Sequence, residues 1–127
     1  MSDLLARHEA LAHRFVERLS AGDVEGVAEL YHDDMRGWRN VDGRELVKKQ
    51  MLKVVAFLSG QVRELRYEEL RIKPLPSGWV QQHVLRAVSP SGTAVEVAAC
   101  LVVTVEDGTI RRIDEYMDSV ALAPLLG

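Results

Sequence analysis

Three runs of sequence decide the fold: Trp79-Val-Gln-Gln-His83-Val-Leu-Arg-Ala-Val88, Thr93-Ala-Val-Glu-Val-Ala-Ala-Cys-Leu-Val-Val-Thr-Val-Glu106 and Thr109-Ile-Arg-Arg-Ile-Asp-Glu-Tyr-Met-Asp118. These three runs are rich in valine, isoleucine, threonine and aromatic residues, which favour a pleated sheet. The segment 89–92 and the pair Asp107-Gly108 separate them. Asp-Gly between two such runs is a strong hairpin signal, because both residues of the tight turn need positive φ. The pattern predicts three consecutive antiparallel strands.

The Asp107-Gly108 turn also predicts which residues face each other. A two-residue turn places Glu106 opposite Thr109, and counting back along both strands then places Cys100 opposite Glu115. The longer turn at 89–92 gives a less direct count, which places His83 opposite Ala98. Side chains alternate between the two faces of a sheet. One face is therefore predicted to hold an apolar surface with a few polar groups: Trp79, Gln81, His83, Leu85, Glu96, Ala98, Cys100, Val102, Ile113, Glu115 and Met117.

The same count assigns the remaining side chains to the opposite face. These are Val80, Val84, Arg86, Val97, Ala99, Leu101, Val103, Arg112, Asp114, Tyr116 and Asp118. Such an apolar face is too large to be left in contact with water over its whole extent. We therefore predict a homodimer that packs through the sheet.

The first half of the chain is mainly helical in pattern. Apolar residues at three- and four-residue spacing predict a helix over 2–20, and Asp23 is predicted to cap a short helix that reaches about Tyr31. A short strand over 35–39 follows, and Asp42 with Glu45 resembles a capping box for a helix that reaches about Leu58. A strand over 62–73 leads into the core hairpins. Helices segregated from an antiparallel sheet predict an α+β domain, and a curved sheet over helices leaves a cavity for a small ligand.

Composition narrows the classes of function. A chain of 127 residues with 47% hydrophobic and 28% charged residues is typical of one globular domain. The net charge of −3 and the lack of a basic run argue against nucleic acid as a partner. No leader-like segment and no apolar run of bilayer-spanning length occur, so we expect no membrane association. With Cys100 as the single cysteine, a cytoplasmic location is the expectation.

The order of elements resembles the superfamily of nuclear transport factor 2 and ketosteroid isomerase, and within it the SnoaL-like group. Four segments carry the resemblance over nearly the whole chain: Ala21-Gly22-Asp23, Ala28-Glu29-Leu30-Tyr31, Asp42-Gly43-Arg44-Glu45 and the closing 107–118. The resemblance implies a single SnoaL-like domain over 1–127, with three amino-terminal helices packed on a curved antiparallel sheet in a cone-shaped fold that encloses a cavity. It implies an isomerase, lyase or hydrolase, or a non-catalytic module, because this fold serves all of these.

Two residues of the predicted cavity face suit acid–base chemistry. The SnoaL-like cyclases use a carboxylic acid and a histidine in the cavity, and by that resemblance Glu115 and His83 are the candidate catalytic residues. A carboxylate among apolar residues has a raised pKa and can transfer protons near neutral pH. The alternative for Glu115 is a solvated position on the other face, and the alternative for His83 is a hydrogen-bonded core histidine. The candidate ligand-binding residues are Tyr31, Trp38, Trp79, Gln81 and Cys100, and core packing is the alternative for the aromatic ones.

Two functions remain open from the sequence. The first is an enzyme without a cofactor that isomerises, cyclises or dehydrates a small apolar substrate by acid–base chemistry. The second is a non-catalytic ligand-binding or dimerisation module of the same fold. The histidines His8, His13, His32 and His83 show no ligand spacing, so no metal is expected.

Overall fold

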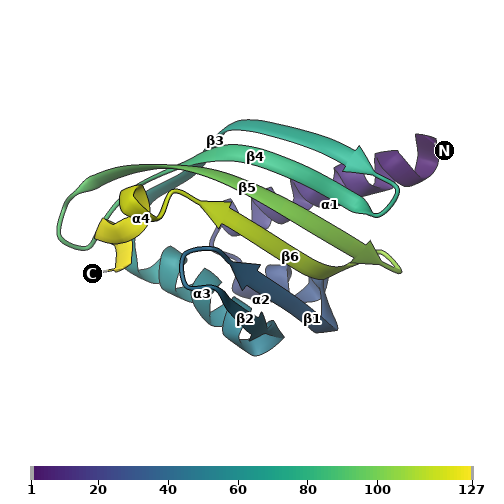
Figure 1. Ribbon diagram of the computed structural model, residues 1–127, viewed down its shortest axis with the longest axis horizontal. Helices are drawn as coiled ribbons and strands as arrows, with labels where there is room; N and C mark the ends of the chain where they lie inside the picture. The colour runs from purple at the N-terminus through teal and green to yellow at the C-terminus, as the bar shows by residue number, and fades with distance from the viewer. Residues whose placement is uncertain (1, 127) are drawn as a thin grey trace.

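The computed structural model describes residues 2–126 as one layer of helices covered by one curved sheet (Figure 1). Helices α1, α2 and α3 lie behind the sheet in that view, and α4 lies at the end of the sheet that bears the β4–β5 turn. The elements in chain order are α1 (Ser2–Ser20), α2 (Val24–Leu30), β1 (Tyr31–Arg39), β2 (Arg44–Val47), α3 (Lys48–Gln61), β3 (Arg63–Leu75), β4 (Gly78–Val88), β5 (Ala94–Glu106), β6 (Thr109–Met117) and α4 (Ser119–Leu126). The predicted α+β class is confirmed.

The six strands form a single sheet in the order β2-β1-β6-β5-β4-β3. All neighbouring strands are antiparallel except β1 and β6, which run parallel. The prediction of a wholly antiparallel sheet was therefore wrong at this pair. The parallel pair arises because β1 and β6 are far apart in the chain, so no hairpin imposes their relative direction. It places the end of β1 beside Glu115, close to the end of β6, where the candidate site lies.

The first two helices form as predicted. Helix α1 spans Ser2–Ser20, and the backbone N–H of Gly26 donates a 2.9 Å hydrogen bond to the Asp23 carboxylate that caps α2. The third helix begins later than predicted, at Lys48, because residues 44–47 form β2 instead. The Asp42 carboxylate accepts from the Arg44 N–H within the preceding turn, so it does not cap a helix. The Gln50 side chain accepts from the Val47 N–H at the actual helix start.

The Asp107-Gly108 turn forms as predicted, with positive φ at both residues, but the register beyond it differs. Glu106 pairs with Thr109 and Val105 with Ile110, after which Thr104 pairs with Arg112 and Leu101 with Glu115. Arg111 is thus the extra residue of a β-bulge. The predicted pairing of Cys100 with Glu115 was wrong by one residue, because the count treated Arg111 as an ordinary ladder residue.

The β4–β5 pairing also differs by one residue from the prediction, since His83 pairs with Ala99. Both shifts act on β5, so its two faces are exchanged while those of β4 and β6 stay as predicted. The inner face of β5 holds Val95, Val97, Ala99, Leu101 and Val103, all buried. The outer face holds Glu96, Ala98, Cys100 and Val102. The surface predicted to form a dimer therefore loses Val97, Ala99, Leu101 and Val103 to the core.

Two clusters of buried side chains hold the layers together. The larger cluster joins α1, α2 and α3 to the sheet around Phe15, Tyr31 and Trp79. The smaller one lies under α4 and includes Leu122 and Leu125 from that helix. Helix α4 was not predicted from the sequence. None of the helices within residues 2–126 combines the length and apolarity needed to cross a lipid bilayer.

Candidate functional site

A pocket of about 340 Å³ lies between the two buried clusters, on the helix-covered face of the sheet. Its lining is mostly apolar and comes from both clusters, with α3, α4 and the strands all contributing. The polar side chains among the lining residues are Tyr31, Arg39, Lys53, Tyr67, His83 and Glu115. An apolar pocket with a few convergent polar groups is the usual form of a small-molecule site.

Glu115 enters the pocket from β6. It lies between Asp114 and Tyr116, whose side chains are on the outer face, and it is paired with the buried Leu101 on β5. Burial raises the pKa of the Glu115 carboxyl to about 7, and the nearby Arg39 opposes this rise. A carboxyl group with this pKa is available in both protonation states near neutral pH, as general acid–base chemistry requires.

Arg39 stands beside Glu115, because these two residues are paired across the parallel strands β1 and β6. One end of its guanidinium donates a 2.7 Å hydrogen bond to the Asp42 carboxylate. Its Nε–H is buried and has no hydrogen-bond partner among the described residues. Arg39 thus brings a positive charge to the pocket wall, held in place from the Asp42 side.

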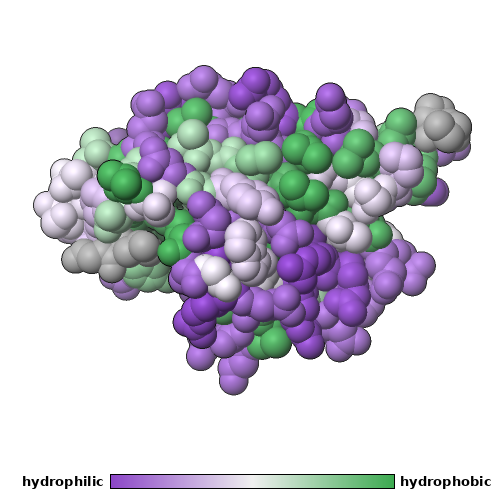
Figure 2. Space-filling model, in the orientation of Figure 1, coloured by the Kyte–Doolittle hydropathy of each residue, from purple (hydrophilic) through white to green (hydrophobic). Residues whose placement is uncertain are grey.

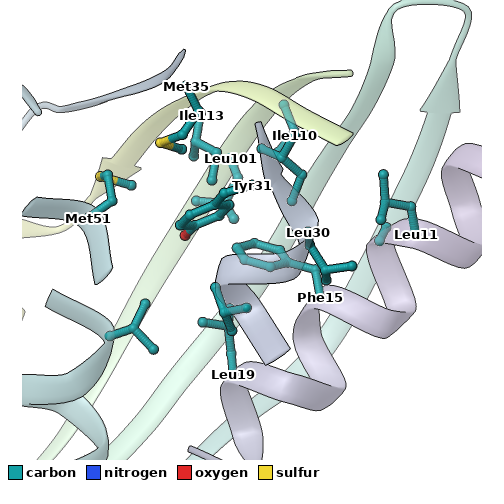
Figure 3. Close-up of a cluster of buried hydrophobic side chains, with 14 of the residues drawn as sticks. Leu11, Phe15, Leu19, Leu30, Tyr31, Met35, Met51, Leu101, Ile110 and Ile113 are labelled. Carbon is teal, nitrogen blue, oxygen red and sulfur yellow. The ribbon is translucent and has the colours of Figure 1, made fainter. Parts of the chain in front are cut away.

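Two phenol groups line the same pocket. Tyr31 begins β1 and Tyr67 lies on β3, and Figure 3 shows the Tyr31 ring packed among Phe15, Leu101 and Ile113. Burial raises the pKa of both phenols, and the charge of Glu115 raises them further. Both groups therefore remain protonated at neutral pH and can donate a hydrogen bond to a ligand oxygen.

His83 lies on β4 at the end of a short chain of buried hydrogen bonds. The Trp79 Nε1–H donates to the Gln81 Oε1 at 3.1 Å, and the Gln81 Nε2 lies 3.2 Å from the His83 Nδ1. The Tyr67 ring packs on the His83 ring with a centroid separation of 5.1 Å. Burial lowers the pKa of His83 to about 4, so the imidazole is neutral at pH 7.

The structure does not bring all the predicted site residues together. Glu115, His83 and Tyr31 line the pocket, whereas Trp38 and Cys100 lie on the outer face. Trp38 packs there on Tyr116 at a ring separation of 5.3 Å, because Met35, Gly37 and Arg39 take the inner positions of β1. Cys100 is outside because of the exchanged faces of β5. The predicted placement of these two residues in the cavity was therefore wrong.

Trp79 and Gln81 are on the predicted face but lie behind the pocket wall. Trp79 is fully buried and packs edge-on against Phe15, with ring centroids 6.2 Å apart. Gln81 is also fully buried, between Trp79 and His83. Neither residue lines the pocket, and Gln81 is connected to it through its hydrogen bond with His83.

Three polar residues of the pocket, Arg39, Lys53 and Tyr67, were not predicted from the sequence. The alternation Met35-x-Gly37-x-Arg39 is a signal that could have placed Arg39 on the inner face. The glycine at position 37 is a second signal, because glycine inside a strand often marks a close approach of another element. The structure shows this approach, since a Cβ at Gly37 would lie 2.3 Å from the Met51 sulfur of α3. Tyr67 was hidden because its strand is charged and looks like a solvated edge, and it is bent by bulges near Glu64 and Glu69, where φ is positive.

These side chains can accept a proton, donate hydrogen bonds to an oxygen and enclose an apolar ligand. They form no metal site of the usual kind, since residues 2–126 contain no group of three or more histidine, cysteine, aspartate or glutamate side chains placed to hold an ion. The carboxyl group of Glu115, the neutral imidazole of His83 and the phenols of Tyr31 and Tyr67 are groups that can take part in proton transfer.

Comparison with solved structures shows the same fold in proteins of low sequence identity. A candidate polyketide cyclase from Xanthomonas campestris is 13% identical with a TM-score of 0.81, over 91% of this chain and 93% of that one. PrhC from Penicillium brasilianum is 16% identical with a TM-score of 0.83, over 97% of this chain and 87% of that one. A protein from Catenulispora acidiphila with a ketosteroid isomerase-like fold, solved in complex with trimethylamine, is 11% identical with a TM-score of 0.78, over 90% of both chains.

Comparison with the sequences of curated proteins gave no match. The family model of the SnoaL-like domain, in contrast, matches residues 12–113. This match runs from the middle of α1 to the middle of β6. Five strands carry pocket residues, and the match covers the whole of four of them, β1, β3, β4 and β5. The chain belongs to the family of SnoaL-like domains, with the fold of nuclear transport factor 2 and ketosteroid isomerase.

Proposed function

We propose that the protein is a cofactor-independent enzyme that isomerises, cyclises or dehydrates a small, largely apolar carbonyl compound. Glu115 serves as the general base and His83 as its partner. The observation that supports this most directly is a carboxyl group with a pKa of about 7 in an apolar pocket that it shares with a neutral histidine and two phenols. The pocket volume of about 340 Å³ suits a ligand at the small end of the usual range.

The proposed first step is proton abstraction next to a carbonyl group. The Glu115 carboxylate takes a proton from the adjacent carbon, and the electron pair of the broken C–H bond moves into the carbonyl to give an enolate. Hydrogen-bond donors in the pocket stabilise the oxygen as its charge develops. Return of the proton to another carbon gives an isomer, attack of the enolate on a second carbonyl gives a ring, and departure of a β-hydroxyl with the returned proton releases water.

The simplest test uses a small β,γ-unsaturated ketone, 3-cyclohexen-1-one, as the probe. Its isomerisation to the conjugated ketone appears as ultraviolet absorbance, and its first step alone appears as deuterium uptake in heavy water by NMR. We expect Glu115→Gln to lower either rate by about 100- to 10,000-fold, because it removes the general base. Replacing His83 with Asn should lower it less.

Asp114 offers a matched control for this test. It precedes Glu115 on the same strand but is held on the outer face by Arg112, with a contact of 2.9 Å. Asp114→Asn should leave the rate unchanged. Equal rates for the wild type and Glu115→Gln would contradict the proposal, whereas binding of the ketone without any conversion would favour the non-catalytic alternative.

We also propose a homodimer that packs through the outer face of the sheet. The apolar area on this face is smaller than the one predicted from the sequence. Trp38, Val102 and Tyr116 form an outer patch on which Val102 and Tyr116 are 38% and 47% exposed. Figure 2 shows that apolar and weakly polar residues cross the middle of this face, with hydrophilic residues on either side. The pair Arg112 and Asp114 on β6, and the pair of Arg86 on β4 with Glu96 on β5, place both charge signs on and next to the strands that bear this patch. A two-fold related copy of this chain is the occupant that fits such mixed signs, because each arginine then approaches carboxylates.

We propose a cytoplasmic location on the basis of the cysteine content. Cys100 is the single cysteine and is free, so the chain has no internal disulfide for an oxidising compartment to preserve.

A further inference from the structure

We infer that Trp79 and Gln81 are positioning residues that hold His83 as an imidazole with its proton on Nε2, so that His83 donates a hydrogen bond to the ligand. This inference rests on the proposed function for its consequence, but the tautomer itself is a property of the free protein. It follows from the hydrogen-bonding capacities of three buried side chains on β4.

The first step concerns the orientation of the Gln81 amide. The Trp79 indole N–H can only donate a hydrogen bond, so the Gln81 atom that lies 3.1 Å from it must be the oxygen. The amide NH₂ group then points the other way, toward the His83 ring. Trp79 and Gln81 are both fully buried, so water does not compete for either group.

The second step concerns the His83 ring. The Gln81 NH₂ can only donate, so the Nδ1 atom 3.2 Å away must accept and cannot carry a proton. A neutral imidazole carries its single proton on the other nitrogen, which is Nε2. Protonation of Nδ1 would place two donors against each other inside the core. Burial acts in the same direction, because it lowers the pKa of His83 to about 4.

The third step concerns what Nε2–H can reach. No other side chain or backbone group of residues 2–126 forms a hydrogen bond with the His83 ring, although His83 lines the pocket. Tyr67 contacts the ring with its own ring, and Glu115 in the same pocket makes no hydrogen bond with it. The Nε2–H is therefore available to an acceptor on the ligand. His83 and Glu115 then have different roles, because only Glu115 takes a proton while His83 holds the carbonyl or enolate oxygen.

The test reads the tautomer by NMR of ¹⁵N-labelled, ligand-free protein at pH 7. Protonated and unprotonated ring nitrogens have distinct shifts, and loss of one set of signals in His83→Asn assigns His83 among the four histidines. We expect an unprotonated Nδ1 and a protonated Nε2 in the wild type. In Gln81→Glu the carboxylate accepts from both Trp79 and His83, so the proton should move to Nδ1 or the ring should become charged.

Matched variants keep the test informative. Gln81→Met removes the amide without burying a charge and should give a mixture of tautomers in a folded protein. Gln82→Glu introduces the same charge at the next residue, which is exposed on the outer face, and should leave the His83 signals unchanged. A wild-type ring with its proton on Nδ1, or a ring indifferent to Gln81→Met, would overturn the inference.

The outcome is separable from that of the proposed function. If the His83 signals behave as expected and Glu115→Gln retains full activity on 3-cyclohexen-1-one, the positioning role stands and the proposed base is wrong. If Glu115→Gln abolishes turnover and the His83 proton lies on Nδ1, the base stands and the positioning role is wrong. If both hold, Gln81→Met should lower kcat more than it changes KM, because the donor acts mainly on the developing oxygen charge.

Discussion

Arg39 and Glu115 are paired residues on the parallel strands β1 and β6, and both side chains line the same pocket. Two opposing effects act on the carboxyl group of Glu115: burial raises its pKa and the Arg39 charge lowers it. The resulting pKa of about 7 shows that burial is the stronger effect. The parallel pairing thus tunes the candidate base, and it does so through two residues that are 76 positions apart in the sequence.

The first prediction concerns this pair. Arg39→Met keeps much of the side-chain length but removes the charge, so the pKa of Glu115 should rise above 7. The measurement is the titration of the Glu115 carboxyl carbon by ¹³C NMR, and if the protein is an enzyme the lower limb of the pH profile of kcat/KM should shift in parallel. Arg36→Met on the same strand is the control, because Arg36 is directed toward Glu45 at 4.0 Å. An unchanged or lowered pKa in Arg39→Met would contradict the prediction.

The second prediction concerns stability and the same carboxyl group. The pKa of Glu115 is about 7 in the folded protein against 4.5 for the ordinary group, so the folded state holds the proton more tightly. The contribution of Glu115 to the free energy of unfolding is therefore largest below pH 4.5, and it falls as pH rises from 4.5 to 7. Glu115→Gln should remove this fall and raise the free energy of unfolding at pH 8 by on the order of 3 kcal/mol. Urea unfolding at pH 4.5 and pH 8 measures it, and a destabilised variant at pH 8 would show that the carboxylate has a structural role.

The third prediction concerns His83 and acid. Its pKa is about 4 in the folded protein against 6.5 for the ordinary group, so the unfolded chain takes up the proton first as pH falls. Stability should drop between pH 6.5 and pH 4 by on the order of 2–3 kcal/mol from this group. In His83→Asn this drop should disappear, although the variant is less stable at pH 7. His13→Asn is the control, because His13 is exposed on α1, and it should preserve the acid dependence.

The fourth prediction concerns the β-bulge at Arg111. Deleting this residue leaves Ile110 opposite Val105 and Arg112 opposite Thr104, so every later pair of the hairpin is preserved. The protein should fold with reduced stability and keep the pocket. Deleting Asp114 instead would move Glu115 and Met117 to the outer face and should prevent folding. Circular dichroism and thermal unfolding distinguish the two variants, and equal tolerance of both deletions would contradict the register.

The fifth prediction tests the dimer. Tyr116→Glu places a charge in the middle of the outer apolar patch and should convert a dimer into a monomer at micromolar concentration. Analytical ultracentrifugation measures this change. Val120→Glu serves as the control, because Val120 on α4 is 83% exposed and lies outside the patch. A wild-type monomer under the same conditions would rule out the proposed dimer.

Much of the fold could be predicted from local patterns. The bounds of α1, the Asp23 cap and the Asp107-Gly108 turn depend on neighbouring residues, so the chain determines them without distant contacts. The faces of β4 and β6 were also predicted correctly, because β4 alternates regularly from Trp79 and β6 alternates regularly from Arg112 onward. This placed His83 and Glu115 on the inner face before the structure was known.

The face of β5 could not be obtained by counting. Alternation fixes which residues share a face but does not say which of the two faces is inside, and in β5 both faces are apolar enough to be buried. The bulge at Arg111 decides the matter, since it lets both Ile110 and Ile113 point into the core although they are three residues apart. Packing of both isoleucines against the helices thus selects a register that the turn alone does not.

The sequence by itself determined the family, the helix–sheet class and three of the polar groups in the pocket, Tyr31, His83 and Glu115. Tertiary structure decided their surroundings: Arg39 arrives beside Glu115 through a parallel pairing, Tyr67 approaches His83 from a bent outer strand, and Leu122 reaches the pocket from a helix that no pattern indicated. The pKa of a buried carboxyl group depends on the charges and apolar atoms around it in space. Local sequence determines which residues can form the site, but long-range packing determines the environment that makes Glu115 a candidate base.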